Sequence, residues 1–366
     1  MRLLHTADWH LGKTLKGQNL LDDQEYIIEE IFKIIYDEDI EAVMICGDVY
    51  DRGVPPVEAV DLLNRTLTRL AEKKIPTLII SGNHDSQTRL NFGNRIFERQ
   101  KFFFAAKITD EPRNFVLEDK FGEVYFSPIP FFEPAELQNK FLYTSIERMS
   151  YNDANGYYLD LLRHRIPRGK RRVVMAHVFL TGGEESESER KIVGTLANVD
   201  AKIFETYNYV ALGHLHRPQK FYSGSPLKYS FDEAGQKKSV TIVDLDGEGQ
   251  VQTKRVELTP RRDVRIVNGT IDELRGYLRT EDYIVARLNQ YEIGAREKLE
   301  RNFPNLLGVE FVSRQNLSDD APKKFTAGTE PLDYFAEFFK AQTGEDLNAD
   351  YRAAMGDFLS KISKEE

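Results

Sequence analysis

The sequence predicts an α/β protein whose first strands form a parallel sheet. Between residues 2 and 80, three short apolar runs alternate with two longer stretches whose apolar residues recur at helical spacing. Strands that alternate with helices in this way form sheets covered by helices. Each apolar run also stops at polar residues that can bind a metal ion. We therefore expect an α/β fold with a site along one edge of a sheet.

The elements of this fold can be predicted in order along the chain. Strands are expected at 2–7, 42–46 and 76–80, and later at 171–176 and 209–212. Helices are expected at 24–36 and 57–71, because apolar residues fall on one face of each. Residues 102–132 are strand-rich and aromatic, and residues 139–165 are polar with intermittent helical spacing. Two more strands flank the Gly247-Glu248-Gly249 turn and run to about Leu258.

A domain boundary is predicted at residues 259–262. Beyond it, strands at 264–267, 283–288 and 309–312 alternate with helices at 271–279 and 295–302, the pattern of a small α+β domain. Residues 318–330 are polar and resemble a linker. Two helices are expected in the tail, the first marked by Phe335, Phe338 and Phe339 and the second by an apolar stripe from Tyr351 to Ile362.

Bulk properties exclude several classes of protein. The 366 residues suffice for two or three domains, and no run of 18 apolar residues predicts a membrane span. The N-terminus has no signal-peptide pattern, so a cytoplasmic protein is expected. Cys46 is the single cysteine, which excludes disulfides and thiolate metal cages, and we interpret it as a core residue. A net charge of −9 argues against nucleic-acid binding by bulk electrostatics, so DNA affinity requires a local patch, metal ions or another subunit.

Five predicted strands end in residues with metal-binding side chains. The endings are Asp8 with His10, Asp48, Asn83 with His84, His177, and His214 with His216. Sites in α/β sheets form at the carboxyl ends of strands, so these residues are expected to lie together. His5 lies inside a strand and His164 in a basic helical stretch, so neither belongs to this set.

The side chains at these ends indicate the chemistry. Carboxylate, imidazole and one amide oxygen, without thiolate, favour manganese, iron or zinc over magnesium or calcium alone. Seven ligands are too many for one ion and suit two, and a two-ion site suits phosphate-ester hydrolysis. His84 remains free for general acid catalysis, and Asp85 is expected to hold its ring and favour the charged form.

The motifs resemble those of the calcineurin-like metallophosphoesterase superfamily. The matching segments are Asp8-x-His10, Gly47-Asp48-x-x-Asp51, Gly82-Asn83-His84-Asp85, His177 and Gly213-His214-x-His216. Finer matches to its DNA-processing nucleases are residues 7–13, 186–190, 209–219 and 224–227. The resemblance is strong over residues 1–260 and weaker beyond. It implies a two-sheet sandwich flanked by helices, with a small α+β cap domain and C-terminal helices.

The resemblance also implies ligand sets and roles. One metal would be held by Asp8, His10, Asp48 and His216, and the other by Asp48, Asn83, His177 and His214. His84 would be the catalytic acid or transition-state stabiliser, supported by Asp85. No predicted ligand is missing from the chain.

Further implications concern domains and partners. The similar proteins use manganese, dimerise, pair with an SMC-like ATPase to form a heterotetramer, and cut DNA as exonuclease and endonuclease, at double-strand ends and hairpins. The implied division is a nuclease domain at 1–260, a DNA-capping domain at 263–317 and C-terminal helices at 331–362 that bind the ATPase subunit.

Two alternative functions stay open from the sequence. Residues 47–53 also resemble protein serine/threonine phosphatases, although those enzymes usually have Glu at the position of Asp85 and Gly at that of Leu11. A non-catalytic scaffold of the same fold is the alternative from another class, and the complete ligand set argues against it.

Several features have a structural interpretation beside a functional one. Trp9 is expected to pack under the site rather than stack on a base, and Asp51 with Arg52 could support ligands or form a loop salt bridge. The basic run 168–172 could contact DNA or be a solvated turn. The acidic run 184–189 is expected to be a mobile loop that repels DNA. The tail stripe is expected to bind the ATPase subunit rather than to pack on the small domain.

Overall fold

The computed structural model describes residues 1–141, 149–189, 198–311, 331–343 and 346–362. The chain forms two compact units, Met1–Val312 and Ser313–Glu366. The expected linker at 318–330, the end of the small domain at 312–317, and Arg190 lie outside the described residues. The side chains of Phe338 and Ile362 in the tail are also not described.

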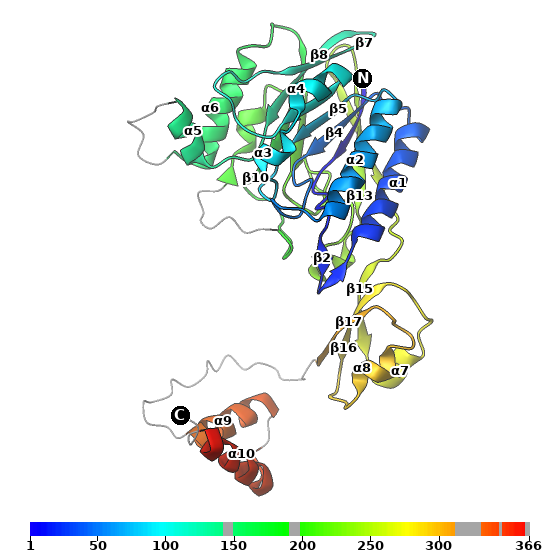
Figure 1. Ribbon diagram of the computed structural model, residues 1–366, viewed down its shortest axis with the longest axis vertical. Coiled ribbons are helices and arrows are strands. Elements are labelled where there is room, and N and C mark those ends of the chain that lie inside the picture. The colour runs from blue at the N-terminus through cyan, green and yellow to red at the C-terminus, as the bar shows by residue number, and fades with distance from the viewer. Residues whose placement is uncertain (142–148, 190–197, 312–330, 344–345, 363–366) are drawn as a thin grey trace. The chain divides into compact units, whose positions relative to one another are not determined.

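The first sheet has six strands in the order β14-β13-β1-β4-β5-β6. Strands β1 (Arg2–Thr6), β4 (Ala42–Cys46), β5 (Thr77–Ile80) and β6 (Phe102–Ala105) are parallel, which confirms the predicted parallel sheet. Strands β13 (Ser239–Leu245) and β14 (Val251–Glu257) extend it antiparallel to β1. Helices α1 (Leu21–Asp37) and α2 (Val57–Glu72) lie side by side on its outer face (Figure 1).

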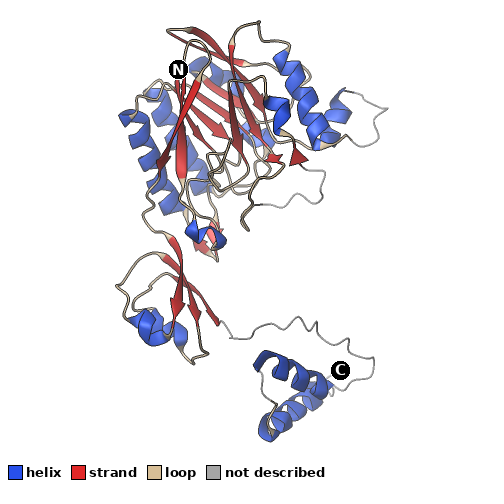
Figure 2. Ribbon diagram, turned by 180° about the vertical axis from the view of Figure 1, so that it is seen from behind, coloured by secondary structure: helices blue, strands red, loops and turns tan. Residues whose placement is uncertain are grey.

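The second sheet has the order β12-β9-β8-β7. Strands β12 (Tyr209–Gly213), β9 (Arg171–His177) and β8 (Gly122–Ile129) are parallel, and β7 (Phe115–Asp119) pairs antiparallel with β8. Helices α5 (Pro134–Phe141) and α6 (Tyr151–Arg163) lie on the far side of this sheet (Figure 2). The layers therefore run helix, sheet, sheet, helix, the two-sheet sandwich that the family resemblance implied.

The two sheets pack face to face on a layer of buried apolar side chains. Met44 and Ile80 of the first sheet and Phe126, Val173 and Met175 of the second are fully buried in one cluster. Apolar residues occupy successive positions in β4 and β5 because both faces of these strands are covered, one by the helices and one by the other sheet.

A buried ion-pair network closes one end of the sandwich. Asp119 at the end of β7 accepts Nη1 and Nη2 of Arg171 at 2.9 and 2.5 Å and lies 2.8 Å from the N-terminal ammonium of Met1. All three groups are almost completely buried. The network fixes the first strand of one sheet to the second sheet, and it gives Arg171 of the basic run a structural role.

A small parallel sheet follows the sandwich. Strands β15 (Val264–Gly269), β16 (Tyr283–Leu288) and β17 (Leu306–Phe311) alternate with α7 (Ile271–Arg275) and α8 (Ala295–Leu299), close to the predicted pattern. Leu274 and Phe303 fill a separate core. Asp23 of α1 accepts hydrogen bonds from Arg262 Nε at 2.8 Å and Tyr283 Oη at 2.6 Å, so a buried carboxylate fixes the start of this domain to the sandwich.

The remaining elements are short, apart from two helices in the second unit. The short elements are β2 (Thr14–Leu15), β3 (Gln18–Asn19), α3 (Gln87–Leu90), α4 (Asn94–Phe97), β10 (Phe179–Leu180), β11 (Asn198–Val199), and 3-10 helices η1 (Glu98–Gln100), η3 (Ala201–Phe204) and η4 (Asp232–Gly235). In the second unit, α9 (Pro331–Thr343) and α10 (Ala349–Ile362) pack together, and Phe335, Phe339, Tyr351 and Phe358 line a hollow of about 230 Å³. The structure describes no helix that is long and apolar enough to cross a membrane.

Candidate metal centre

The five predicted strand ends converge at one edge of the sandwich. Strands β1, β4 and β5 of the first sheet and β9 and β12 of the second contribute the seven predicted ligands and His84. Three groups of these side chains each bring potential ligand atoms within 4.8 Å of one another. The groups are Asp8 with His10 and His216, His10 with Asp48 and His84, and Asp8 with Asp48 and His177.

Asp48 lies at the centre of the cluster. Its Oδ2 is 3.6 Å from His10 Nε2 on one side and 3.4 Å from His177 Nε2 on the other. Its Oδ1 accepts the backbone N–H of His84 at 2.8 Å, which fixes the orientation of the carboxylate. One oxygen of Asp48 therefore faces both halves of the cluster, the geometry that a bridging ligand requires.

In one half of the cluster, the amide oxygen of Asn83 and one ring nitrogen each from His177 and His214 surround a common space. Asn83 Oδ1 lies 3.0 Å from His177 Nε2 and 3.2 Å from His214 Nδ1. The other ring nitrogen of His177, Nδ1, donates to the Cys46 carbonyl at 2.9 Å. That hydrogen bond fixes the tautomer, so His177 Nε2 presents its lone pair toward Asn83 and Asp48 when the ring is neutral.

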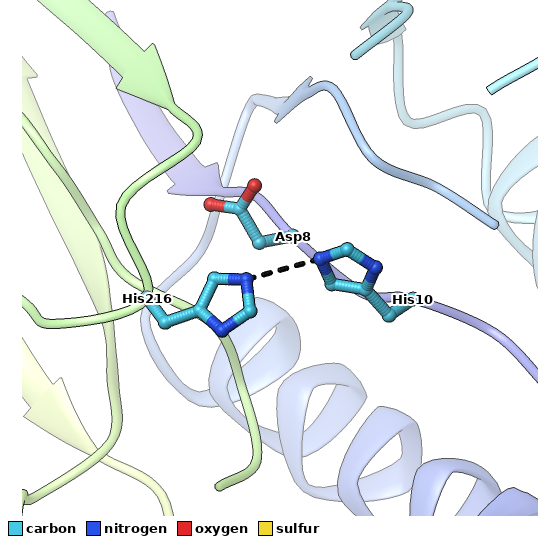
Figure 3. Close-up of side chains that lie close together, drawn as sticks. All are labelled: Asp8, His10 and His216. Atoms are coloured by element: carbon cyan, nitrogen blue, oxygen red, sulfur yellow. Dashed lines mark hydrogen bonds between the residues drawn. The ribbon is translucent and has the colours of Figure 1, made fainter. Parts of the chain in front are cut away.

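In the other half, the rings of His10 and His216 point toward one another beside Asp8 (Figure 3). Their Nε2 atoms are 3.0 Å apart. His216 Nδ1 faces away from this space, toward Ser188 Oγ at 2.7 Å. His10 Nδ1 has no hydrogen-bond partner among the described residues and lies 3.5 Å from Asp51 Oδ1. Two imidazole nitrogens thus face the space beside the Asp8 carboxylate.

The backbone at the strand ends is strained. Asp8, His10, Asp48 and His214 all have positive φ, between 44° and 106°, which non-glycine residues rarely adopt. Such conformations cost about 1–3 kcal/mol each and persist at functional sites because surrounding contacts enforce them. The turns allow residues at adjacent positions to point at different partners.

Glycines permit the close approach of the strand ends. A Cβ on Gly213 would lie 1.8 Å from the Cys46 carbonyl oxygen, and one on Gly82 would lie 2.1 Å from Asp48 Oδ1. Any other residue at either position would push β12 or the loop after β5 away from β4. The glycines that precede His214 and Asn83 are therefore part of the geometry that gathers the ligands.

Comparisons with known proteins agree with this geometry. A family model for calcineurin-like phosphoesterases matches residues 1–218. A protein from Staphylococcus epidermidis, named as the D subunit of the nuclease SbcCD, is 33% identical over 95% of both chains. The chain belongs to the calcineurin-like phosphoesterases, in the family of the SbcCD nuclease D subunits. The expected superfamily is thereby confirmed.

Other similar proteins are more distant or match a shorter part. A protein from Staphylococcus saprophyticus with the same name is 34% identical over 75% of this chain and 73% of its own. The crystal structure of TT1561 from Thermus thermophilus is 13% identical and covers 69% of this chain and 98% of its own. The TM-score between the two structures is 0.38.

The donor set of this phosphoesterase fits divalent cations. Burial raises the pKa of Asp8 well above its usual range, and the Asp48 charge adds to this effect although His177 opposes it. Burial alone would lower the pKa of His177, but Asp48 and Asp8 together raise it to about 9. The two carboxylates therefore attract positive charge to the point between them, where a cation satisfies both.

The other three candidate histidine ligands have lowered pKa values, which favour the neutral ring that metal ions bind. Burial lowers the pKa of His10 to about 3, and burial together with the His177 charge lowers that of His214 to about 3. Burial also lowers the pKa of His216. Neutral imidazoles, carboxylates and an amide oxygen are groups that bind divalent metal ions.

His84 lies beside the cluster, but Asp85 does not hold its ring. His84 Nδ1 donates to the Asp51 carbonyl at 2.8 Å, and the ring packs edge-on against His10. The Asp85 carboxylate instead accepts the backbone N–H groups of Val49, Tyr50 and Gly82. The predicted contact between Asp85 and the His84 ring is wrong, because three amides nearer to the carboxylate bind it. Asp85 ties the loop after β4 to the loop after β5.

The sequence interpretation also missed the residues that surround His216. The acidic run 184–189 is not a freely solvated loop, because Ser186 and Glu189 are buried. Glu189 Oε1 accepts the backbone N–H of His216 at 2.6 Å, and Ser188 contacts the His216 ring. Burial raises the pKa of Glu189 to about 8. The match of residues 186–190 to related nucleases was the one signal in the sequence that could have indicated this role.

The structure bears on three other open interpretations. Trp9 is 3% exposed and donates from Nε1 to Thr6 Oγ1 at 2.9 Å, so it packs under the site as expected. Asp51 forms a salt bridge with Lys13 at 2.8 Å while also facing His10 Nδ1. In the basic run, Lys170 pairs with Glu123 at 2.7 Å, and Arg171 is buried against Asp119, which leaves less of the run for phosphate contacts.

Proposed function

We propose that this chain is the manganese-dependent DNA nuclease subunit of an SbcCD-type complex, acting on phosphodiesters. The observation that carries the proposal is the position of Asp48 Oδ2 between two sets of ligands, 3.6 Å from His10 and 3.4 Å from His177. The relatives at 33% and 34% identity, both named as the D subunit of the nuclease SbcCD, support a nucleic acid as the substrate.

The proposed ligand sets follow the two halves of the cluster. Asp8, His10, Asp48 and His216 would hold one ion, and Asp48, Asn83, His177 and His214 would hold the other. When bound, the two ions supply an activated water and neutralise charge on the phosphate. Mixed imidazole and carboxylate ligands suit manganese, iron or zinc, and manganese is the metal that the family resemblance implies.

The residues of the chain orient this chemistry. Asp48 is fixed by the His84 backbone N–H, and His177 by the Cys46 carbonyl. Asp85 holds the loops that carry Asp48 and Asn83 at a constant separation through three backbone hydrogen bonds. Its contribution to catalysis is therefore indirect, in contrast to the direct support of His84 that we expected.

His84 is the proposed general acid or transition-state stabiliser. Its Nδ1 is committed to the Asp51 carbonyl, so Nε2 is the atom left to meet a phosphate or leaving oxygen. Since Nδ1 already carries one proton, donation from Nε2 requires the doubly protonated ring. A general acid placed in this way contributes about 10²–10⁴-fold to the rate.

The proposal extends to domains and partners. Residues 1–260 form the nuclease domain, residues 263–317 cap the DNA, and the helices at 331–362 bind an SbcC-type SMC-like ATPase. The exposed aromatic rings of Tyr334, Tyr351 and Phe358 in the tail support a protein-binding role. In the assembled complex two nuclease subunits pair as a homodimer within a heterotetramer, in the cytoplasm.

A nuclease assay tests the function. The purified chain, alone and with its ATPase partner, is incubated with end-labelled duplex and hairpin DNA in manganese, in magnesium and in chelator. Cutting in manganese that chelator abolishes is the expected result. Hydrolysis of a phosphopeptide without any cutting of DNA would contradict the proposal and favour a phosphatase.

A further inference from the structure

A buried polar network lies behind His216, on the side away from the ligand cluster. It consists of Ser188 and Glu189 from the loop after β10, Glu233 from η4, and Lys238 before β13. Ser188 is partly buried and the other three are at most 7% exposed. Four polar side chains gathered around one residue go beyond what packing requires, because each must be desolvated.

The hydrogens of this network can be assigned from its donors and acceptors. Lys238 Nζ lies 2.5 Å from Glu233 Oε2, a pairing that keeps the Glu233 carboxylate ionised and therefore an acceptor only. The Ser188 hydroxyl hydrogen consequently points to Glu233 Oε1, its other close neighbour. Ser188 Oγ then accepts from His216 Nδ1 across the 2.7 Å between them.

This assignment fixes the state of the metal-facing nitrogen. With the proton on Nδ1, His216 Nε2 presents a lone pair toward the space shared with His10 and Asp8. The opposite tautomer would leave Nδ1 without a proton 3.3 Å from the Glu233 carboxylate, an unfavourable contact between two acceptors. Ser188 and Glu233 thus select one tautomer.

The backbone of His216 is held by the same network. Its N–H donates to Glu189 Oε1 at 2.6 Å, and its carbonyl accepts from Lys238 Nζ at 2.9 Å. The loop is anchored to the following segment, since the Glu187 N–H donates to Asp232 Oδ2 at 2.9 Å. Ring, N–H and C=O of His216 are therefore all fixed by residues 188–189, 233 and 238.

We propose that Ser188 and Glu233 are positioning residues that set the tautomer and orientation of His216 as a metal ligand, with Glu189 and Lys238 holding its backbone. The inference rests on the proposed function only for the presence of the ion at His216. Partners of this kind, one step removed from a metal, typically contribute 10–100-fold to metal affinity.

The decisive variant is Ser188→Ala, because it removes the bridging hydroxyl and leaves the Glu233–Lys238 pair intact. In a calorimetric titration, we expect the Kd of the manganese ion at the site that includes His216 to rise about 10–100-fold. Ser188→Thr keeps the hydroxyl and is expected to restore the affinity to within about threefold. The matched control is Ser239→Ala, which removes another buried hydroxyl, one that has no hydrogen-bond partner among the described residues.

A spectroscopic measurement separates positioning from general destabilisation. In the metal-free, folded protein, the ¹⁵N shifts of the His216 ring should show the proton on Nδ1. The Nε2–H form should gain population in Ser188→Ala, because only the longer 3.3 Å contact with Glu233 Oε1 then favours a proton on Nδ1, and circular dichroism should confirm that the variant is folded. A wild-type ring protonated on Nε2, or unchanged manganese affinity in folded Ser188→Ala, would overturn the inference.

The proposed function and the positioning role of Ser188 can fail separately. If the wild-type chain binds manganese and shows these tautomers but cuts no DNA, the proposed function fails and the positioning role stands. If DNA is cut while Ser188→Ala binds manganese as tightly as the wild type, the positioning role fails and the function stands.

Discussion

Replacing His84 by Gln separates catalysis from metal binding. Among the residues that the structure describes, the His84 ring makes one hydrogen bond, from Nδ1 to the Asp51 carbonyl at 2.8 Å, and an edge-on contact with the His10 ring. A glutamine amide can donate to the same carbonyl, and the His84 backbone N–H that fixes Asp48 is retained. The substitution therefore removes the group that can transfer a proton and leaves the surrounding contacts in place.

The expected size of the change in kcat follows from these contacts of the His84 ring. Loss of a general acid lowers kcat by about 10²–10⁴-fold, which corresponds to about 2.7–5.4 kcal/mol at 1.36 kcal/mol per tenfold change. Because the hydrogen bond to Asp51 can be replaced, DNA affinity and manganese affinity should change by less than about threefold. The loss should thus appear in kcat and leave KM nearly unchanged.

Three assays on the same preparation check these expectations. Single-turnover cutting of labelled duplex DNA gives the rate, a gel-shift titration gives DNA affinity, and calorimetry gives manganese stoichiometry and Kd. The alternative is that His84 binds metal directly, since one of its ring nitrogens lies within 4.8 Å of ligand atoms of His10 and Asp48. A fall in manganese stoichiometry in the glutamine variant would refute the division of roles.

Three further predictions concern stability and assembly. Asp119→Asn should lower the free energy of unfolding by about 3–5 kcal/mol at pH 7, measured by urea titration, because it breaks a buried pair with Arg171. Burial opposes ionisation of Asp119, but Arg171 and the N-terminus outweigh it and hold its pKa well below the usual range. The stabilisation by ionised Asp119 is therefore present above pH ~4 and lost as the pH falls further. Between pH 5 and 3 the free energy of unfolding should fall less steeply in the variant than in the wild type. An equal dependence on pH in the two proteins would contradict the assignment. Gly213→Ala should lower the free energy of unfolding by at least about 1–3 kcal/mol and weaken manganese binding, since its Cβ would overlap the Cys46 carbonyl; unchanged melting and binding would show that β12 can move. A chain ending before Pro331 should keep manganese binding and DNA cutting but lose co-purification with the ATPase subunit; retained co-purification would refute the role of the tail.

The sequence was sufficient to predict most of the sandwich and the convergence of the candidate ligands at one edge of it. Strands β4 and β5 are continuous apolar runs because both of their faces are buried, and such runs are easily recognised. The carboxyl ends of parallel strands meet at one edge, so local sequence around Asp48 and Asn83 also predicted a spatial relation between them.

Contacts that depend on distant loops could not be predicted in the same way. The run Glu184–Glu189 has the composition of a solvated loop, and only the folded chain shows that Glu189 meets the His216 N–H. Asp85 follows His84 directly, which suggested a contact between their side chains. In the structure the two side chains have different partners, because the His84 ring donates to the Asp51 carbonyl and the Asp85 carboxylate accepts amides of the loop after β4.

The measurement that tests the central claim most directly is the manganese titration of Asp48→Asn beside the wild type. A carboxylate shared by two ions, as the position of Asp48 Oδ2 indicates, should affect both when it is replaced. We predict two ions per wild-type chain with manganese-dependent DNA cutting, and weakened binding of both ions with loss of cutting in the variant. Two ions bound with unchanged affinity in the variant, or a wild-type chain that cuts DNA fully in the presence of chelator, would contradict the account.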